Sequence, residues 1–141
     1  MPANYYTRSE RSDVRKKPEP KLRVSEADVQ QAVVLMLELD GWRFFRTEMT
    51  VQREFGRAVG ESGMPDALFL RYWQPDHLHN DTRPIGEMLW IEMKAPGKPL
   101  KTHQRDWADA ERKRGALVLK VDSIDDFKSW YRNSGLNRNM L

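Results

Sequence analysis

Two runs rich in apolar and aromatic side chains, residues 67–73 and 88–94, constrain the fold of this chain most strongly. Both have the length and composition of β-strands. The segment between them, residues 74–86, is polar, contains two prolines and has the composition of a surface loop. We therefore expect the two runs to form an antiparallel pair of neighbouring strands.

The pairing register of these strands decides which side chains meet. With Trp73 opposite Glu87, the register places Asp66 opposite Lys94. Glu92 and Lys94 are two residues apart, so both side chains leave the same face of the pleated sheet. We therefore expect Asp66, Glu92 and Lys94 to cluster at one end of the hairpin.

This cluster joins two short motifs, Gly63-Met64-Pro65-Asp66 and Glu92-Met93-Lys94. The two carboxylates and the backbone carbonyl of Met93 are oxygen ligands of the kind that Mg²⁺ or Mn²⁺ prefers. Such a cation stabilises charge on a phosphodiester in the transition state and lowers the pKa of its bound water. Lys94 could orient the attacking water or offset phosphate charge.

Each of these residues also has a purely structural interpretation. Asp66 could cap a turn after Pro65, and Glu92 and Lys94 could form an exposed charge pair on an edge strand. Glu26 could supply another carboxylate to the metal, but an acid in the first turn of a helix is also favoured by the helix dipole.

The remaining pattern predicts a helix that begins after Ser25, with Asp28 completing a capping box, and ends before Gly41. The other predicted elements are a strand over 42–51, a helix over 103–114 capped by Thr102, a central strand over 116–121, and a helix over 124–131 capped by Ser123. The apolar faces of the three helices comprise Val29, Ala32, Val33, Met36 and Leu37; Trp107, Ala108 and Ala110; and Phe127, Trp130 and Tyr131. The order of helix, three strands, helix, strand and helix predicts an α/β fold with a mixed central sheet flanked by helices.

Composition narrows the classes of function. The chain has 141 residues, which suits one domain, and no cysteine, which excludes disulfides and thiolate metal sites. With three histidines, a zinc site is disfavoured and a carboxylate site for a hard cation fits better. We find neither an apolar run long enough to span a membrane nor a secretory signal, so we expect a cytoplasmic protein.

The net charge of +3 is unevenly distributed. Residues 1–24 form a basic arm that is rich in lysine, arginine and proline and includes Lys16 and Lys17. We interpret this arm as a flexible extension that could follow a phosphate backbone, or as a solvated leader. Residues 25–132 would then form the domain, and residues 133–141 a loose tail. The glycine-rich segment 52–63 could form a projecting hairpin.

The ordered set of residues resembles the VRR-NUC family of the PD-(D/E)XK nuclease superfamily over residues 25–131. The matching features are Glu26 and Gln30, Gly63-x-Pro65-Asp66, Glu92-x-Lys94, Gln104 and Trp107, Gly115 before an apolar strand, and Ser123-Ile124-Asp125-Asp126-Phe127. The resemblance implies that Glu26, Asp66 and Glu92 bind metal, that Lys94 is the catalytic lysine, and that Gln104 helps to hold the lysine or the water. Without the resemblance, Gln104 could equally be a solvated residue of a first helical turn.

The resemblance implies that the protein is an Mg²⁺- or Mn²⁺-dependent DNA endonuclease, which hydrolyses phosphodiesters with metal-activated water. Stand-alone relatives act as homodimers on branched DNA such as Holliday junctions, in recombination or repair in the cytoplasm of a bacterium or of a phage-infected host. Residues expected to contact DNA are Gln30, Arg53, Arg57, Lys98, Lys101, His103, Lys16 and Lys17. The alternatives are a catalytically silent DNA-binding accessory module and a sequence-specific restriction-type nuclease on the same fold.

Overall fold

A computed structural model describes residues 23–47, 51–52, 57–58, 60–73 and 85–138. The helices are α1 (Glu26–Leu39), α2 (Thr102–Lys113) and α3 (Ile124–Asn133). The strands are β1 (Arg43–Arg46), β2 (Val51–Gln52), β3 (Arg57–Ala58), β4 (Ala67–Trp73), β5 (Ile85–Met93) and β6 (Leu117–Val121). The protein is therefore a mixed α/β fold, as the pattern predicted. Of the strand predicted over 42–51, β1 covers only Arg43–Arg46, whereas Val51 belongs to β2, which pairs with β3 in the hairpin that was one interpretation of segment 52–63.

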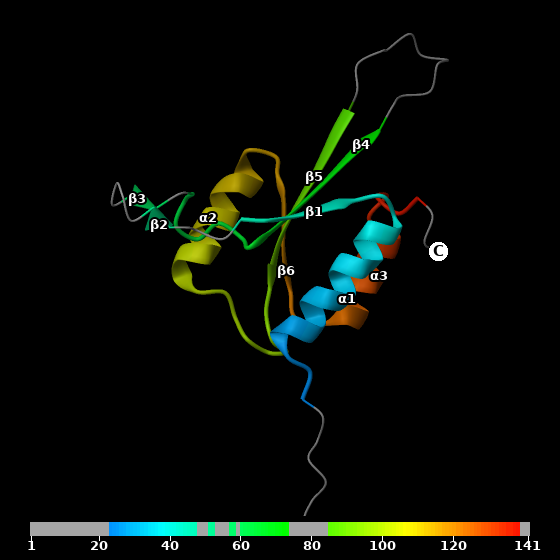
Figure 1. The fold of residues 1–141 in the computed structure, drawn as a ribbon, viewed down its shortest axis with the longest axis horizontal. Helices are drawn as coiled ribbons and strands as arrows, with labels where there is room; N and C mark the ends of the chain where they lie inside the picture. The colour runs from blue at the N-terminus through cyan, green and yellow to red at the C-terminus, as the bar shows by residue number, and fades with distance from the viewer. Residues whose placement is uncertain (1–22, 48–50, 53–56, 59, 74–84, 139–141) are drawn as a thin grey trace, which may run out of the picture.

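The central sheet has four strands in the order β1-β4-β5-β6, and β6 runs parallel to β5 while the other pairs are antiparallel. In Figure 1, α2 lies on one side of this sheet, and α1 and α3 lie together on the other. The sheet is therefore sandwiched unequally, with two helices over one face and one helix over part of the other.

The β4–β5 pairing is correct in direction, but our predicted register is wrong by two residues. Trp73 pairs with Ile85 rather than with Glu87, and Ala67 pairs with Ile91. The sequence pattern placed the start of β5 three residues late, because Ile85 and Gly86 resemble the end of a loop. A shift of two residues leaves every side chain on its predicted face of the sheet. In the observed register Asp66 therefore lies beside Glu92, whereas the predicted register placed it opposite Lys94.

Strand β6 lies at the edge of the sheet, and the prediction that it is central is wrong. Its apolar run has another cause, because α2 packs over one of its faces and α3 over the other. Val118 and Val121, which point to opposite faces, are both buried. An edge strand with two covered faces thus has the continuous apolar sequence of an internal one.

The helix ends largely follow the sequence signals. Ser25 and Asp28 form the predicted capping box of α1, and Ser123 caps α3. The predicted cap of α2 is wrong by one residue, because Lys101 occupies that position and Thr102 begins the helix. Lys101 N–H donates to the side chain of Gln104 at 3.0 Å, so a glutamine in the first turn caps the helix from within.

The main hydrophobic core lies between the sheet and the α1–α3 layer. It is formed by Val29, Val33, Leu37, Trp42, Ala67, Phe69, Leu89, Ile91, Met93, Val121, Phe127 and Tyr131. The predicted apolar faces of α1 and α3 contribute to it, with Ala32, Met36 and Trp130 less deeply buried. On α2, Ala108 is buried and Trp107 half-buried, whereas Ala110 is exposed, contrary to the prediction.

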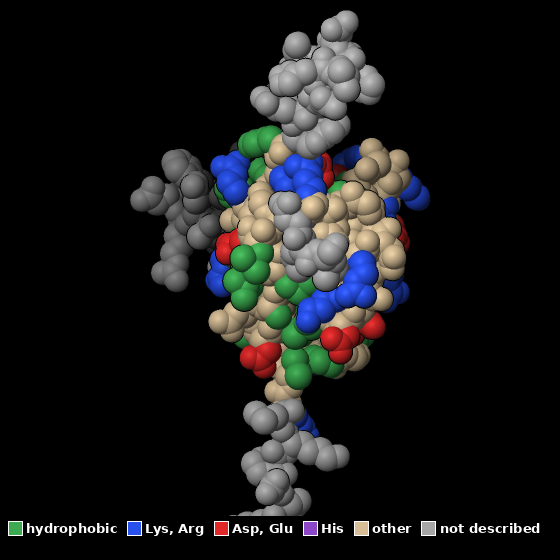
Figure 2. Space-filling model, turned by 90° about the vertical axis from the view of Figure 1, so that its right-hand side faces the viewer, with side chains coloured by type: hydrophobic (Ala, Val, Ile, Leu, Met, Phe, Trp, Pro, Cys, Tyr) green, Lys and Arg blue, Asp and Glu red, His purple; other side chains and the backbone are tan. Residues whose placement is uncertain are grey.

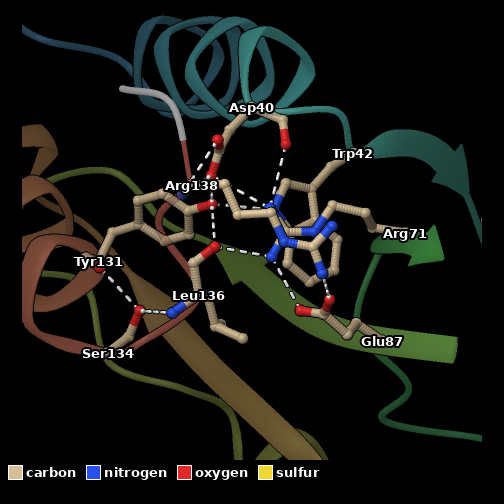
Figure 3. A network of polar contacts seen from close by, with 8 residues as sticks. All are labelled: Asp40, Trp42, Arg71, Glu87, Tyr131, Ser134, Leu136 and Arg138. Atoms are coloured by element: carbon tan, nitrogen blue, oxygen red, sulfur yellow. Dashed lines mark hydrogen bonds and ion pairs between the residues drawn. The ribbon is translucent and has the colours of Figure 1, made fainter. Parts of the chain in front are cut away.

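A buried polar network, which we call the Arg71 cluster, closes the upper part of this core (Figure 3). It comprises Asp40, Trp42, Arg71, Glu87, Tyr131, Leu136 and Arg138. Arg71 donates to Asp40 Oδ2 at 3.1 Å, to Glu87 Oε2 at 2.8 Å and to the Leu136 carbonyl at 2.6 Å. Its guanidinium carbon lies 4.3 Å from the centre of the Trp42 ring.

The Asp40 carboxylate also accepts hydrogen bonds from the Tyr131 hydroxyl and, at 3.2 Å, from the Arg138 N–H. The Arg138 guanidinium in turn contacts Glu87. Residues 134–138 therefore pack against the domain, whereas the sequence led us to expect a loose tail from residue 133. The cluster pairs two cations with two carboxylates, so its formal charge is balanced.

The face on the right of Figure 1 carries hydrophobic side chains in several separate patches, with basic and acidic side chains between them (Figure 2). Among the described residues, no helix combines the length and the apolar content needed to cross a bilayer. The longest of the described helices, α1, has 14 residues.

Candidate active site

Strands β4 and β5 bring Asp66 and Glu92 together. Asp66 immediately precedes β4, and the Thr47 N–H donates to its carbonyl at 3.0 Å, which extends the β1–β4 pairing by one residue. Continuing the β4–β5 register by one residue places Asp66 beside Glu92. Both side chains lie on the face of the sheet that α2 partly covers, opposite to the α1–α3 core.

Glu92 is the centre of the site, and its side chain is held at both oxygens. Gln104 Nε2 donates to Oε1 at 2.8 Å, and Lys94 Nζ lies 3.4 Å from the same atom. The backbone N–H of Asp66 donates to Oε2 at 3.4 Å. Only 4% of Glu92 is exposed, so these contacts form in a largely desolvated place. We call Asp66, Glu92, Lys94 and Gln104 the Glu92 cluster.

The electrostatics of Glu92 are those of an incompletely neutralised carboxylate. Burial raises the pKa of the Glu92 carboxyl above its ordinary value, and the negative charge of Asp66 raises it further. Lys94 and the hydrogen bond from Asp66 act in the opposite direction but do not cancel the rise. The charged form of Glu92 is therefore disfavoured, first by burial and then by Asp66, and a cation bound between the two carboxylates would favour it.

Asp66 differs from Glu92 in being exposed. Within the described part of the chain, its carboxylate has no hydrogen-bond or ion-pair partner. The pair thus combines one fixed, buried carboxylate with one that faces solvent, and the exposed member can reach an incoming ligand without breaking an existing contact.

Gly63 explains why the first motif begins with glycine. Its φ of +87° lies in the left-handed region, and a Cβ atom there would be 2.0 Å from the carbonyl oxygen of His103. The segment before Asp66 therefore lies directly against the first turn of α2. Because Gln104 follows His103, this close approach also helps to position the amide that holds Glu92.

Three contacts that the sequence did not reveal strengthen the same junction. The Trp107 indole donates to Glu61 Oε2 at 2.7 Å, and the ring of Trp107 lies edge-on to Trp90 at 5.1 Å. Next to the end of β1, the Thr47 hydroxyl donates a hydrogen bond to the Pro65 carbonyl. Neither Glu61 nor Thr47 belongs to a recognisable motif, because each acts through a partner that is distant in sequence.

Asp122 is a further contributor that sequence reasoning missed. Its carboxylate accepts a hydrogen bond from Gly97 N–H at 3.1 Å and contacts Lys120 Nζ at 3.0 Å. These contacts lower its pKa, the Lys120 side chain contributing most. Asp122 thereby anchors the turn that leads from Lys94 towards α2.

The other predicted site residues fall into three groups. Met93 buries its side chain in the core, which leaves only its backbone for the Glu92 cluster. Lys98, Lys101 and His103 are exposed on the segment that joins β5 to α2 and on the first turn of α2. Lys16, Lys17, Arg53 and the side chain of Arg57 lie outside the described residues.

Glu26 and Gln30 lie apart from this set on α1. Glu26 is exposed in the first turn, which lies at the same lower end of the molecule as the C-terminal end of β5 (Figure 1). Gln30 lines a groove between α1 and β1 together with Phe44 and Arg46. Over the described ranges, no three carboxylate or histidine side chains gather into a ready-made metal group, so Glu26 is not joined to Asp66 and Glu92.

No protein-family model, no curated protein and no solved structure matches this chain. The chemistry of the site must therefore be argued from its own residues. The donor set of two neighbouring carboxylates is all oxygen, and it is of the kind that suits a hard divalent cation.

Proposed function

We propose that this protein is a divalent-metal-dependent DNA endonuclease that acts on branched DNA. The observation that carries the proposal is the buried Glu92 carboxylate, held by Gln104 and Lys94 and adjacent to the exposed carboxylate of Asp66. A carboxylate pair beside a lysine can hold a divalent metal and stabilise the charge that develops during phosphodiester hydrolysis.

The site residues fit Mg²⁺ or Mn²⁺, because both neighbouring carboxylates offer oxygen ligands. Burial first, and the charge of Asp66 second, raise the pKa of Glu92, and a bound dication would favour its charged form. Asp66 and Glu92 would hold the ion, with the Met93 carbonyl as a further oxygen ligand. When bound, the ion would stabilise negative charge on the phosphodiester and lower the pKa of water.

The chain's own residues have separable roles in this proposal. Gln104 fixes Glu92 Oε1 through its amide and is itself fixed by Lys101 N–H, so Glu92 is oriented before a ligand arrives. Lys94 Nζ, whose side chain is 12% exposed, provides a positive charge and hydrogen-bond donors for a phosphate oxygen or for the attacking water. The exposed Asp66 carboxylate faces the incoming ligand.

The basic residues near α2 favour a polyanionic substrate. Lys98, Lys101 and His103 are exposed beside the cluster, and they would contact phosphates rather than bases. Contacts to phosphates suit recognition by DNA shape and backbone rather than by base sequence. A homodimer with two such sites could cut both strands of a symmetric junction.

The experiment is cleavage of a synthetic four-way junction and of linear duplex, with Mg²⁺, with Mn²⁺ and with chelator. We expect metal-dependent cutting that favours the junction. Asp66→Asn, Glu92→Gln and Lys94→Met should each lower the cleavage rate by about 100-fold or more while junction binding persists.

Matched controls are Asp109→Asn and Lys128→Met, which remove an exposed acid from α2 and an exposed lysine from α3. They should cut at the wild-type rate. Wild-type protein that binds junctions but cuts with neither metal would instead indicate an accessory DNA-binding module. Cutting at one linear sequence would indicate a restriction-type nuclease.

A further inference from the structure

The face of the sheet that carries Glu92 is arranged in rows that lead away from the site. The first row is Thr47, Asp66 and Glu92, and the next is Phe45, Leu68 and Trp90. The third row is Arg43, Leu70 and Met88, and beyond it Tyr72 pairs with Gly86. Successive rows are about 7 Å apart, because each strand advances two residues between them.

Helix α2 covers only the β5–β6 half of these rows. Trp107 packs on Trp90, and Ala108 and Val118 are buried. Over β1, β4 and the start of β5, the face is open: Phe45 is 39%, Met88 49% and Tyr72 63% exposed. Among the described residues, no atom lies within 4 Å of the position that a Cβ atom of Gly86 would occupy, so none of them covers Gly86 beside Tyr72.

The Arg43 side chain lies in the middle of this exposed area. The Arg43 guanidinium carbon is 5.3 Å from the centre of the Phe45 ring and 5.5 Å from that of Tyr72, and its Nη2 donates to the Tyr72 hydroxyl at 3.2 Å. Among the described residues, Arg43 has no acidic partner. We call Arg43, Phe45, Leu70, Tyr72 and Met88 the Arg43 strip.

We propose that the Arg43 strip binds single-stranded nucleic acid by stacking unpaired bases on Phe45 and Tyr72. These bases would lie next to the nucleic-acid strand whose phosphodiester enters the Glu92 cluster. Every base has a π face that stacks on aromatic rings or on a guanidinium plane, and the positive charge of Arg43 complements the phosphates. The strip is continuous with the Glu92 cluster. The inference rests on the proposed nuclease function, because that function places the phosphodiester to be cut at the Glu92 cluster. It adds that the substrate contains unpaired bases.

The test measures binding without metal, so that it does not depend on cleavage. A fluorescent mixed-sequence oligodeoxynucleotide is compared, by anisotropy, with an oligonucleotide of the same length that contains only abasic sites. Wild-type protein should bind the oligonucleotide with bases about 5- to 100-fold more tightly. Tyr72→Leu and Phe45→Leu should reduce this preference severalfold, whereas Tyr72→Phe should retain it.

Control variants are Leu39→Ala and Arg132→Gln, which remove an exposed apolar side chain from α1 and an exposed arginine from α3 and should leave the preference unchanged. Equal wild-type binding of the two oligonucleotides would overturn the proposal. So would a homodimer that Tyr72→Leu dissociates in sedimentation, because the strip would then be a protein interface. Base-dependent binding without any metal-dependent cutting would refute the nuclease alone, and cutting without base preference would refute the strip alone.

Discussion

Two carboxylates are buried on opposite sides of the central sheet, and their surroundings differ in kind. Asp40, 1% exposed, accepts hydrogen bonds from Arg71, Tyr131 and Arg138 in a network whose charges balance. Glu92, 4% exposed, has one lysine at 3.4 Å and a second carboxylate beside it. A buried carboxylate that is fully satisfied stabilises the fold, whereas one that is not retains the capacity to bind a cation.

The pKa values express the same contrast. Burial opposes the charge of Arg71, but the hydrogen bond and the charge of Glu87 outweigh it, so the pKa of Arg71 is raised and the ion pair persists. At Glu92, burial and Asp66 together raise the pKa of an acid, which disfavours its charged form. Changes in the Arg71 cluster should therefore destabilise the protein, and changes in the Glu92 cluster should abolish activity with little loss of stability.

The largest expected effect on stability comes from Arg71→Met. Removing the guanidinium leaves Asp40 and Glu87 buried without their main cation, which should lower the free energy of unfolding by about 3–5 kcal/mol. Urea denaturation followed by tryptophan fluorescence measures this loss. The exposed Arg132→Met should change stability by less than about 0.5 kcal/mol. A loss below about 1 kcal/mol for Arg71→Met would refute the structural role of the cluster.

Gly63→Ala should have the next largest effect and lower the free energy of unfolding by roughly 2–4 kcal/mol. The added Cβ would clash with the His103 carbonyl, and alanine is strained at the left-handed φ of this position. Gly97→Ala is the matched control, since φ there is +80° but no atom lies within 4 Å of the added Cβ. Thermal denaturation should show the difference between the two variants. Equal losses would mean that the contact between the Gly63 segment and α2 is not tight in solution.

Tyr131→Phe should lower the free energy of unfolding by about 1–3 kcal/mol near neutral pH. The Trp42 indole loses an acceptor at 2.9 Å, and the Asp40 carboxylate loses a hydrogen-bond donor. Burial, and then the hydrogen bond to Asp40, raises the pKa of Tyr131 to about 12. Since a free tyrosine titrates near pH 10, the folded state keeps its proton longer than the unfolded chain does. This contribution to stability is complete below about pH 10 and is lost as the pH rises towards 12.

The alkaline slope of stability should consequently be shallower in Tyr131→Phe than in the wild type. Leu39→Ala removes an exposed side chain that does not titrate and serves as the control, with a slope like that of the wild type. Tyrosinate absorbance of the folded protein should include a late-ionising component that vanishes in Tyr131→Phe. An unchanged slope in that variant would contradict the buried hydrogen bond.

The smallest effect, and one of opposite sign, is expected for Glu92→Gln. Because the pKa of Glu92 is raised by burial and by Asp66, the folded protein loses stability as the pH rises from the ordinary glutamate value, about 4.3, through the raised one. The glutamine does not titrate, so the variant should be slightly more stable than the wild type at neutral pH and equal to it in acid. Denaturation midpoints at several pH values test this.

Added Mg²⁺ or Mn²⁺ should stabilise the wild type and not Glu92→Gln, because an ion that binds only the folded state raises its stability by mass action. Asp109→Asn should respond to the ion as the wild type does. A lower stability of Glu92→Gln at neutral pH, or an equal response to metal, would show that Glu92 belongs with Asp40 as a structural carboxylate.

Local signals in the sequence predicted most of the elements, because caps and apolar periodicity act over a few residues. The capping box at Ser25 and the cap at Ser123 are of this kind. The side of the sheet that Glu92 occupies was also predictable. Side chains alternate between the two faces of a strand, so a register shift of two residues leaves Glu92 on the same face. The register itself was not, because β5 begins at Ile85 within a segment of loop-like composition.

What the sequence could not reveal depends on contacts between distant residues. Arg71 looks like a solvent-facing residue of a strand, and its partners Asp40, Glu87 and Leu136 lie 31, 16 and 65 residues away. In the Glu92 cluster, the motifs indicated Asp66 and Lys94, but only the structure shows that Glu92 is held at both oxygens. Glu26 was considered for a metal role because it is an acid in the first turn of a helix, and the resemblance implied the same role, but the structure does not join it to the other carboxylates.

The participation of Leu136 and Arg138 in the Arg71 cluster has a consequence for how the protein is made. A nascent chain can place Asp40, Arg71 and Glu87 together while residues 136–138 are still inside the ribosomal exit tunnel, but it cannot then complete their contacts. The cluster is therefore completed only after those residues emerge, in keeping with the folding of domains as units. A chain truncated before Leu136 would leave Arg71 and Asp40 without these contacts, so it should open more readily than the chain that retains them.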